Sequence, residues 1–304
     1  MDNLVVVDGD LIPYCVGFAC QKSSYSIVDS NGKIIENGIK GKKAAIEALI
    51  DKPNGCIFQE DIHAEPLGIV LSTVNTMIAR IIEGSKCDHY KVFLTGDTNY
   101  RDDIATLRKY KGHRDGTAKP IHWQSIRDHL IKAHGAVVAE GIEADDAVSI
   151  VQTKYRAKGA RCVIATFDKD LNGTAGLHYN FQSGKDILYD VSEDEALYFF
   201  YKQVLTGDLA TDNIQGIPGI GDKKADKILA DVPINDKDLY QAILGAYTEY
   251  YEKHPEEYQH WDTDKYPEPI KPDAKTILIE NARLIHMLKE PVKKGVVPLW
   301  NPPE

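Results

Sequence analysis

LVVVDGD, at residues 4–10, is a short run of β-branched apolar residues that ends abruptly in carboxylates. Runs of this kind are typical of strands buried on both faces of a parallel sheet. The pattern returns twice, because predicted strands at Lys91–Leu94 and Arg161–Thr166 lead into TGD at 95–97 and FDKD at 167–170. The sequence therefore predicts three parallel strands that deliver acidic side chains at their carboxyl ends.

Helices are predicted between these strands, at Leu67–Glu83, Ile121–His134 and Ala144–Lys158, and a proline precedes each of the first two. This alternation indicates an α/β fold with a mostly parallel central sheet flanked by helices and a site at the strand carboxyl ends. A β-hairpin is predicted at Tyr25–Asn37, because Asn31-Gly32 separates two apolar-rich pieces.

Two segments depart from the alternation. Residues 98–119 are rich in Lys and Arg and poor in apolar residues, which predicts a solvated, mobile excursion from the sheet. Beyond about residue 190 the strand patterns fade and helical patterns dominate, which predicts a second, helical lobe. We therefore expect two domains, at residues 1–190 and 191–304.

The composition fits a globular protein, because 304 residues of which 43% are hydrophobic can bury one large core or a core plus a satellite domain. The sequence has no run of roughly 18 apolar residues and no signal-peptide order at its start. The five cysteines form no CxxC pair, which argues against a disulfide framework and a zinc site. We expect a cytoplasmic protein with no membrane association.

The formal net charge of −10 argues against a nucleic-acid partner, since phosphate binding usually needs a basic surface. The objection weakens if carboxylates gather around bound cations, which invert the local field. Each acidic group alone is explained as a turn residue or a first-turn helix residue. Their recurrence at successive strand ends is harder to attribute to turns. The groups are Asp8, Asp97, Glu143 with Asp145 and Asp146, Asp168 with Asp170, and Asp208 with Asp212.

Six motifs occur in order along the chain: VVVDGD, TGD, YKGHR, GIEADDA, TFDKDL and GDLATDNIQGIPGIGDKKA. Together they resemble the motifs of the 5′ nuclease superfamily of flap endonucleases and 5′→3′ exonucleases. The resemblance spans residues near 4 to 230, about three-quarters of the chain, and an ordered set is far more specific than one motif. Within the superfamily the chain looks most like the small bacteriophage 5′→3′ exonucleases, to which PLWNP near residue 300 is also similar.

The resemblance implies a PIN-like nuclease core at residues 1–190, with a helical arch formed by residues 98–119. It implies a helical DNA-binding lobe at residues 191–304, with a helix-three-turn-helix around the loop 214–224. The implied activity is hydrolysis of DNA phosphodiesters at or near 5′ ends with two or more Mg²⁺ ions, for which Mn²⁺ can substitute. The implied partner is a DNA duplex with a 5′ end, gap or flap, or an RNA–DNA hybrid. No protein partner is inferable.

The resemblance also implies which residues form the site. Asp8, Asp97, Glu143, Asp145 and Asp146 would surround one metal ion, and Asp168, Asp170, Asp208 and Asp212 the second. The superfamily usually spaces the last pair as GDxxD, whereas this chain has GDLATD, one residue longer. If this segment is helical, Asp212 still points inward but is displaced around the helix axis, so it is the least secure ligand.

Basic and glycine residues complete the predicted site. Lys111 and Arg114 of YKGHR are the predicted catalytic cations, because cations near the scissile phosphate stabilise developing charge. The alternative is a solvated basic loop. Glycines would let the backbone approach a DNA phosphate at the loop 214–224, and the alternative there is a simple Gly-Pro turn. The predicted DNA contacts are Tyr100, Arg101, Tyr110, Gly216, Gly219, Gly221, Lys223 and Lys224.

Two other functions fit parts of the sequence. VVVDGD also resembles the nucleophile motif of haloacid-dehalogenase-type phosphatases, in which Asp8 would attack phosphate and Asp10 would act as the acid. That interpretation leaves EADD, DKD and GIPGIG without a purpose. A catalytically silent protein that binds branched DNA is the other alternative, although unneutralised carboxylates would repel DNA.

Overall fold

The computed structural model describes residues 3–114, 116–271 and 273–304. The chain separates into two compact units. Unit 1 comprises Met1–Gly9, Arg80–Thr117 and His134–Glu304, and unit 2 comprises Asp10–Ala79 and Ala118–Ala133. This separation cuts the chain elsewhere than at residue 190. The expected division into a nuclease core and a DNA-binding lobe therefore remains a prediction.

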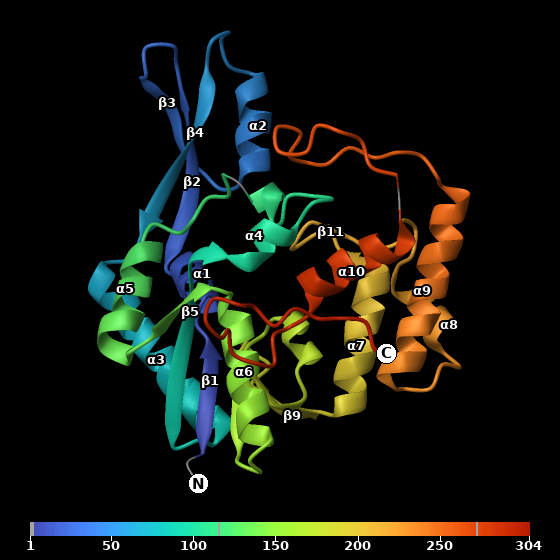
Figure 1. Cartoon of the computed structure of the whole chain (residues 1–304). Coiled ribbons are helices and arrows are strands. Elements are labelled where there is room, and N and C mark those ends of the chain that lie inside the picture. The colour runs from blue at the N-terminus through green and yellow to red at the C-terminus, as the bar shows by residue number, and fades with distance from the viewer. Residues whose placement is uncertain (1–2, 115, 272) are drawn as a thin grey trace. The chain divides into compact units, whose positions relative to one another are not determined.

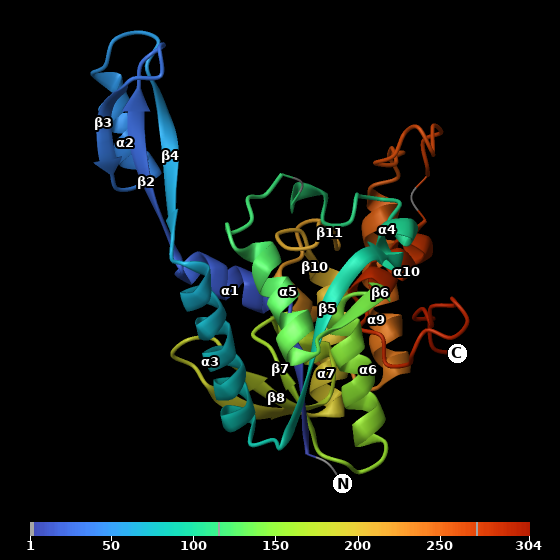
Figure 2. The ribbon, with the colours of Figure 1, turned by 90° about the vertical axis from the view of Figure 1, so that its left-hand side faces the viewer.

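Unit 1 is built on a six-stranded sheet in the order β6-β5-β1-β7-β8-β9. Figure 1 labels its strands β5, β1 and β9, and Figure 2 labels β6, β7 and β8. All neighbouring strands are parallel except β8 and β9, so the predicted mostly parallel α/β fold is confirmed. The three strands predicted from sequence occupy β5, β1 and β7 at the centre. The strands are β1 (Leu4–Asp8), β5 (His89–Asn99), β6 (Val137–Gly141), β7 (Cys162–Ala165), β8 (Gly176–Asn180) and β9 (Ile187–Val191).

The register of the central strands brings their polar ends together. Val7 of β1 pairs with Val92 of β5 and with Ala165 of β7, so Asp8 and Thr166 follow at the same edge of the sheet. The apolar residues of β1 are buried, in agreement with a strand covered on both faces. Helix α6 (Ala144–Arg156) packs against β1, β5, β6, β7 and β8.

A further set of elements in unit 1 follows the sheet in sequence, apart from η2 (Lys169–Gly173), which lies between β7 and β8, and the helices of this set pack mainly on one another (Figure 1). Their core includes the aromatic residues Phe200, Tyr201, Tyr240, Tyr247 and Trp300. These elements are η2 (Lys169–Gly173), α7 (Glu193–Thr206), β10 (Gly207–Asp208), β11 (Ile214–Gln215), α8 (Asp222–Leu229), α9 (Asp236–Lys253) and α10 (Ala274–Ile285).

Unit 2 contains a three-stranded antiparallel sheet in the order β3-β2-β4, next to α2 in Figure 2. The predicted hairpin is confirmed as β2 and β3, whereas β4 was not predicted. Helix α3 begins in unit 2 and ends in unit 1. The elements are α1 (Leu11–Ala19), β2 (Gln21–Val28), β3 (Ile34–Ile39), α2 (Lys42–Ile50), β4 (Ile57–Ala64), α3 (Leu67–Ser85) and α5 (Trp123–His134).

Helix α3 is long and apolar enough to cross a membrane by length and composition, with a mean hydropathy of 1.3. The expectation from sequence counted only unbroken runs of apolar residues. The helix α3 is continuous, but its apolar sequence is interrupted by polar residues at Ser72, Thr73, Asn75, Arg80 and Glu83. Core helices of soluble proteins pass the same test, so this finding is weak evidence for a membrane.

The basic segment 98–119 differs from both expectations for it. In its described part, which leaves out residue 115, it forms a five-residue helix, α4 (Tyr100–Ile104), and a three-residue 3₁₀ turn, η1 (Gly112–Arg114). A helical arch is therefore not formed here. The prediction of a solvated segment is confirmed only in part: Tyr100, Arg101 and Tyr110 are buried, whereas residues 113–114 and 116–119 are exposed. The buried hydrogen bonds of Arg101 and Tyr110, described below, explain why polar composition alone did not predict that these side chains turn inward.

Two glycines allow the close backbone packing that follows α7. Gly207 ends the helix with a φ of 67°, a left-handed conformation that favours glycine. A Cβ atom on Gly216 would lie 2.4 Å from the backbone nitrogen of Gly207 and 2.4 Å from the carbonyl oxygen of Leu205. Gly216 is therefore required by packing against α7 and β10.

Gly216→Ala should lower the free energy of unfolding by about 1–3 kcal/mol, because the added methyl group must displace backbone. Gly245→Ala is the matched control: the position lies within α9 and has open space around its Cβ position. There alanine should leave stability unchanged or raise it by up to about 1 kcal/mol. Urea unfolding of both variants measures the difference, and equal stability of the two would contradict this account of Gly216.

Candidate active site

Four acidic side chains of unit 1 lie close to one another where the central strands end. Burial raises the pKa of Asp145 well above its usual range, and the negative charges of Asp8, Asp168 and Glu143 raise it further. Asp8 is fixed by a hydrogen bond of 3.2 Å from Thr166 Oγ1 to its Oδ2. The backbone amide of Asp168 donates to the same hydroxyl at 3.0 Å. The strand ends therefore hold this first acidic group in place.

A second acidic group lies around Asp170 and shares Asp168 with the first. Burial and the charges of Asp168, Asp208 and Asp212 raise the pKa of Asp170 to about 7. Gln203 Nε2 of α7 donates to Asp170 Oδ1 at 2.8 Å. Asp208 Oδ2 is buried and accepts no hydrogen bond from the described residues, although Lys169 Nζ lies 3.4 Å away. This group thus concentrates negative charge that the protein only partly compensates.

The donor chemistry of the two groups fits divalent cations of the magnesium type, which take oxygen ligands and keep several waters. The described part of the chain contains no group of three or more His, Cys, Asp and Glu side chains arranged to hold a metal ion as it stands. The carboxylates nevertheless suit divalent cations, because they repel one another in a buried site and bound cations would relieve this repulsion.

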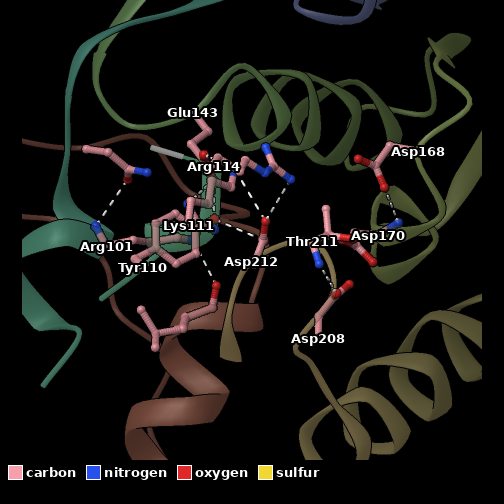
Figure 3. Close-up of polar contacts among 12 residues, drawn as sticks. Arg101, Tyr110, Lys111, Arg114, Glu143, Asp168, Asp170, Asp208, Thr211 and Asp212 are labelled. Carbon is pink, nitrogen blue, oxygen red and sulfur yellow. Dashed lines mark hydrogen bonds and ion pairs between the residues drawn. The ribbon is translucent and has the colours of Figure 1, made fainter. Parts of the chain in front are cut away.

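The two basic residues predicted to be catalytic, Lys111 and Arg114, lie beside Glu143 and Asp212 (Figure 3). Lys111 Nζ lies 2.5 Å from Glu143 Oε1 and 3.6 Å from Asp212 Oδ1. Arg114 donates to Asp212 Oδ1 at 3.3 Å. Lys111 has a φ of 52°, unusual for a residue with a side chain, so its backbone is held in a strained turn. The turn places an ammonium group directly beside carboxylates.

Glu143 is the carboxylate whose charge Lys111 and Arg101 neutralise. Burial alone would raise its pKa, but Lys111 and Arg101 outweigh burial and lower the pKa to about 2. The hydroxyl of Tyr110 adds a hydrogen bond of 2.8 Å to Glu143 Oε2. Glu143 also caps the first turn of α6, in a capping box with Asp146.

Asp146 and Arg101 form a buried ion pair, which contradicts their predicted roles. Arg101 donates to both carboxylate oxygens of Asp146, at 2.5 and 3.0 Å, and to the carbonyl oxygens of Leu284 and His286. The backbone amide of Leu288 also donates to Asp146, at 3.0 Å. Because these donors occupy its oxygens, Asp146 is a structural residue and not a metal ligand. Arg101 is 1% exposed and is not a DNA contact.

Asp97 does not join the acidic groups either. The pairing of β5 with β6 is irregular between Thr95 and Asn99, and Asp97 lies within this irregular stretch and is exposed. It lines a separate pocket with Asp102, Asp103 and Glu140, whose described lining contains no other predicted ligand. The sequence showed a carboxylate after a strand, but it could not show this change of register.

The predicted contacts of Tyr100 and Tyr110 with DNA are also wrong. Tyr100 is 7% exposed, which leaves no ring face for an unpaired base. Tyr110 is 5% exposed, and its hydroxyl donates to Glu143 and, at 3.1 Å, to Asp212 Oδ2. Tyr110 therefore holds two carboxylates and does not stack on DNA.

The GDLATD segment is a turn and not a helix. Helix α7 ends at Thr206, and Asp208 Oδ1 accepts from the backbone amide of Thr211 at 2.9 Å. The extra residue of the spacing is accommodated in this turn. It places Asp212 beside Lys111 and Arg114, between the two acidic groups. The helical argument for its displacement is therefore wrong, whereas its role as a ligand stays untested.

The glycine-rich loop 214–224 divides into a packed half and an open half. Gly216 belongs to the packed half and is not available for phosphate contact. Gly219 and Gly221 are exposed, with open space where a Cβ atom would stand. Lys223 and Lys224 are exposed in the first turn of α8, and Lys224 Nζ donates to the carbonyl oxygen of Gly219 at 2.8 Å.

Three polar residues of the site were not singled out in the sequence. Thr166 and Lys169 stand within TFDKD, so their proximity to the acids was available as a signal. Gln203 lies on α7, more than thirty residues after Asp170, and no local pattern marks it.

Comparisons with known proteins find related sequences for part of the chain. Residues 59–190 match the family of the 5′-3′ exonuclease N-terminal, resolvase-like domain. DNA polymerase I of Bacillus caldotenax is 29% identical over 168 residues, which cover 50% of this chain and 19% of the polymerase. A 5′-3′ exonuclease of Buchnera aphidicola subsp. Baizongia pistaciae is 24% identical over 170 residues, which cover 53% of this chain and 56% of that protein.

Solved structures share the fold of the chain. The flap endonuclease of bacteriophage T5, in a complex with DNA and metal ions, has a TM-score of 0.52 at 16% identity, and 94% of this chain and 89% of that chain are covered. The chain thus shares its fold and a nuclease-family segment with the 5′ nuclease superfamily, and the resemblance seen in the motifs is confirmed. The matches span about a fifth to about half of the lengths of the two curated relatives.

Glu143→Gln should reduce stability in a pH-dependent manner. Because the folded-state pKa is lowered from 4.5 to about 2, ionised Glu143 stabilises the folded protein above about pH 4.5, and this contribution is lost as the pH falls toward 2. The pH-dependent part is about 3 kcal/mol. Urea unfolding in EDTA between pH 7 and pH 3 should show the deficit of the variant shrinking as the pH falls.

Glu140→Gln, which removes an exposed carboxyl group on β6, serves as the control and should follow the wild type across the range. A Glu143→Gln deficit that stays constant from pH 7 to pH 3 would contradict the ion-pair account.

Proposed function

We propose that this protein is a metal-dependent 5′ nuclease, a 5′→3′ exonuclease or flap endonuclease that hydrolyses DNA phosphodiesters at or near 5′ ends. The observation that carries the proposal is the pair of acidic groups that share Asp168 at the strand ends, with Lys111 and Arg114 beside them. A buried concentration of carboxylates suits a phosphate substrate only when cations are bound. The family match at residues 59–190 supports the same activity.

Two divalent cations, Mg²⁺ or Mn²⁺, would supply an activated water and stabilise the in-line displacement at phosphorus. Asp8, Glu143, Asp145 and Asp168 would hold one ion. Asp168, Asp170, Asp208 and Asp212 would hold the other. Asp97 and Asp146 are left out of this set for the reasons given above. The T5 exonuclease of similar fold, with a TM-score of 0.50, has been solved with zinc ions bound.

Lys111 and Arg114 would bind the scissile phosphate and balance charge that develops on it. In the DNA-free protein both are paired with carboxylates, Lys111 with Glu143 and Arg114 with Asp212. Cations bound by the carboxylates would weaken these ion pairs and release the basic side chains toward phosphate. The protein's own ion pairs thereby hold the site together until substrate arrives.

The open half of the glycine loop would anchor the DNA duplex. Gly219 and Gly221 leave the backbone accessible, and Lys223 and Lys224 add positive charge at the start of α8. Backbone amides and lysines at such a place bind phosphate without reading sequence. We infer that the partner is duplex DNA with a 5′ end, gap or flap, and that the protein acts inside the cell.

The phosphatase alternative is weakened by the surroundings of Asp10. That residue is ion-paired with Arg127 at 2.7 Å within unit 2, and a general acid would have to leave this pair. GDLATD also follows a helix, whereas the phosphatase motif calls for a strand. A catalytically silent DNA-binding protein would have the same fold and the same partner, so only a measurement of DNA cleavage distinguishes it from the nuclease.

Asp145→Ala and Asp168→Ala should each abolish cleavage of a 5′-labelled duplex and of a flap substrate in Mg²⁺, while folding and part of the DNA binding persist. Removal of one carboxylate takes away a metal ligand and relieves repulsion of phosphate. Asp97→Ala, an exposed carboxylate outside both groups, is the matched control and should cleave like the wild type.

Product lengths from the wild type distinguish removal of terminal nucleotides from flap cutting. A wild type that binds both DNA substrates but cuts neither with Mg²⁺ or Mn²⁺ would favour the silent binding protein. Turnover of a small phosphomonoester that is lost in Asp10→Asn, with DNA left whole, would establish the phosphatase.

A further inference from the structure

A pocket of about 420 Å³ in unit 1 is separate from both acidic groups. Its size falls within the range of roughly 300–1,000 Å³ that is usual for ligand pockets. Tyr250 and Tyr251 of α9 line it, together with Tyr258 from the segment that follows this helix. Arg108 also lines it, with Gln215 and Pro218 of the glycine loop 214–224.

The lining offers aromatic faces in an ordered arrangement. The rings of Tyr250 and His254 stack with their centroids 4.4 Å apart and their planes at 30°. Tyr250 meets Tyr251 edge-on, with centroids 5.1 Å apart and planes at 87°. Tyr251 packs in turn near Tyr247, which is fully buried. The pocket therefore presents aromatic rings that a rigid helix holds in fixed orientations.

Arg108 gives the pocket a fixed guanidinium group. Its Nε donates to Gln215 Oε1 at 2.8 Å, and one terminal nitrogen donates to the same oxygen. The side chain of Arg108 is otherwise exposed. Glu256 is the carboxylate in the described lining, so the pocket carries one positive and one negative group. This balance favours an uncharged, planar aromatic ligand, and stacked rings and arginine planes are how proteins hold unpaired bases.

The place of the pocket in the fold links it to the site. Arg108 lies two residues before Tyr110, which contacts Glu143 and Asp212 of the candidate active site. The backbone amide of Lys111 donates to the carbonyl oxygen of Asp212 at 3.0 Å, which fixes this basic segment to the turn before the glycine loop. Gln215 and Pro218, which line the pocket together with Arg108, belong to that loop. A DNA strand held by both would pass the pocket.

We propose that this pocket binds an unpaired nucleobase of the DNA substrate, stacked against Tyr250. The inference rests on the proposed function, because it names the structural feature of DNA that the nuclease would select. A strand with an unpaired base next to the duplex would bind more tightly than a fully paired duplex. The pocket would thereby contribute to preference for flaps, gaps or frayed ends.

The test compares binding of two DNA molecules with Ca²⁺ in place of Mg²⁺, because Ca²⁺ also takes oxygen ligands and neutralises the carboxylates. The two molecules are a duplex with a single-stranded arm and the fully paired duplex. The arm carries 2-aminopurine at one unpaired position at a time, because its fluorescence is quenched by stacking. The wild type should quench the probe at one position. Tyr250→Leu should remove the quenching and weaken binding of the armed duplex about fivefold or more.

Three controls make the result specific. Tyr250→Phe keeps the ring and should bind the armed duplex within about twofold of the wild type. Tyr155→Leu, a half-buried tyrosine of α6 outside the pocket, should have no effect. The fully paired duplex should bind equally to all variants. Equal binding of the armed duplex by Tyr250→Leu and wild type would overturn the proposal, as would equal weakening on both DNA molecules.

A further arm of the experiment uses dAMP alone. If dAMP saturates the wild type but not Tyr250→Leu, while the armed duplex binds both equally, the pocket takes free nucleotides and the proposal is overturned. Cleavage in Mg²⁺ is measured separately on the same DNA. Absence of cleavage by the wild type sinks the proposed function, whereas cleavage without the Tyr250-dependent preference sinks only the pocket.

Discussion

The constraint on which the site depends is the repulsion among carboxylates that parallel strands deliver to one edge of a sheet. Basic side chains of the protein offset this repulsion mainly at Asp146 and Glu143. Arg101 neutralises Asp146, and Lys111 neutralises Glu143. Around Asp145 and Asp170 the negative charge is left with little compensation, and the pKa values of both rise. A folded protein that retains such a concentration of buried charge is poised to bind divalent cations and, through them, phosphate.

The buried Arg101–Asp146 pair connects this site to the rest of unit 1. Arg101 leaves the end of β5, meets α6 through Asp146, and reaches the chain at the end of α10 through the carbonyl oxygens of Leu284 and His286. Removal of one partner from such a pair is costly, because the other charge remains buried without compensation. The basic segment is therefore part of the core at Arg101 and part of the site at Lys111, within about ten residues.

Periodicity and the carboxylates at strand ends were enough to predict the α/β class and the three central strands. They also singled out the acidic residues that gather around Asp145 and Asp170. Local sequence could not show that Arg101 turns inward, because its partner Asp146 is 45 residues away. It could not show that Asp97 turns outward, since the cause is an irregularity in strand pairing. The argument about Asp212 assumed a helix at Asp208–Asp212, whereas α7 ends at Thr206 and the segment forms a turn after the two-residue strand β10. In each case a tertiary contact or a local backbone change decided the role of a residue whose type was recognised correctly.

The central claim is that the two acidic groups sharing Asp168 bind two divalent cations without the help of Asp97. Counting Mn²⁺ ions bound to the metal-free protein, in the absence of DNA and at neutral pH, tests it most directly. The account predicts two ions per chain for the wild type and for Asp97→Asn, and fewer for Asp168→Asn. Wild-type protein that binds no Mn²⁺, or an Asp168→Asn variant that binds as many ions as the wild type, would contradict it.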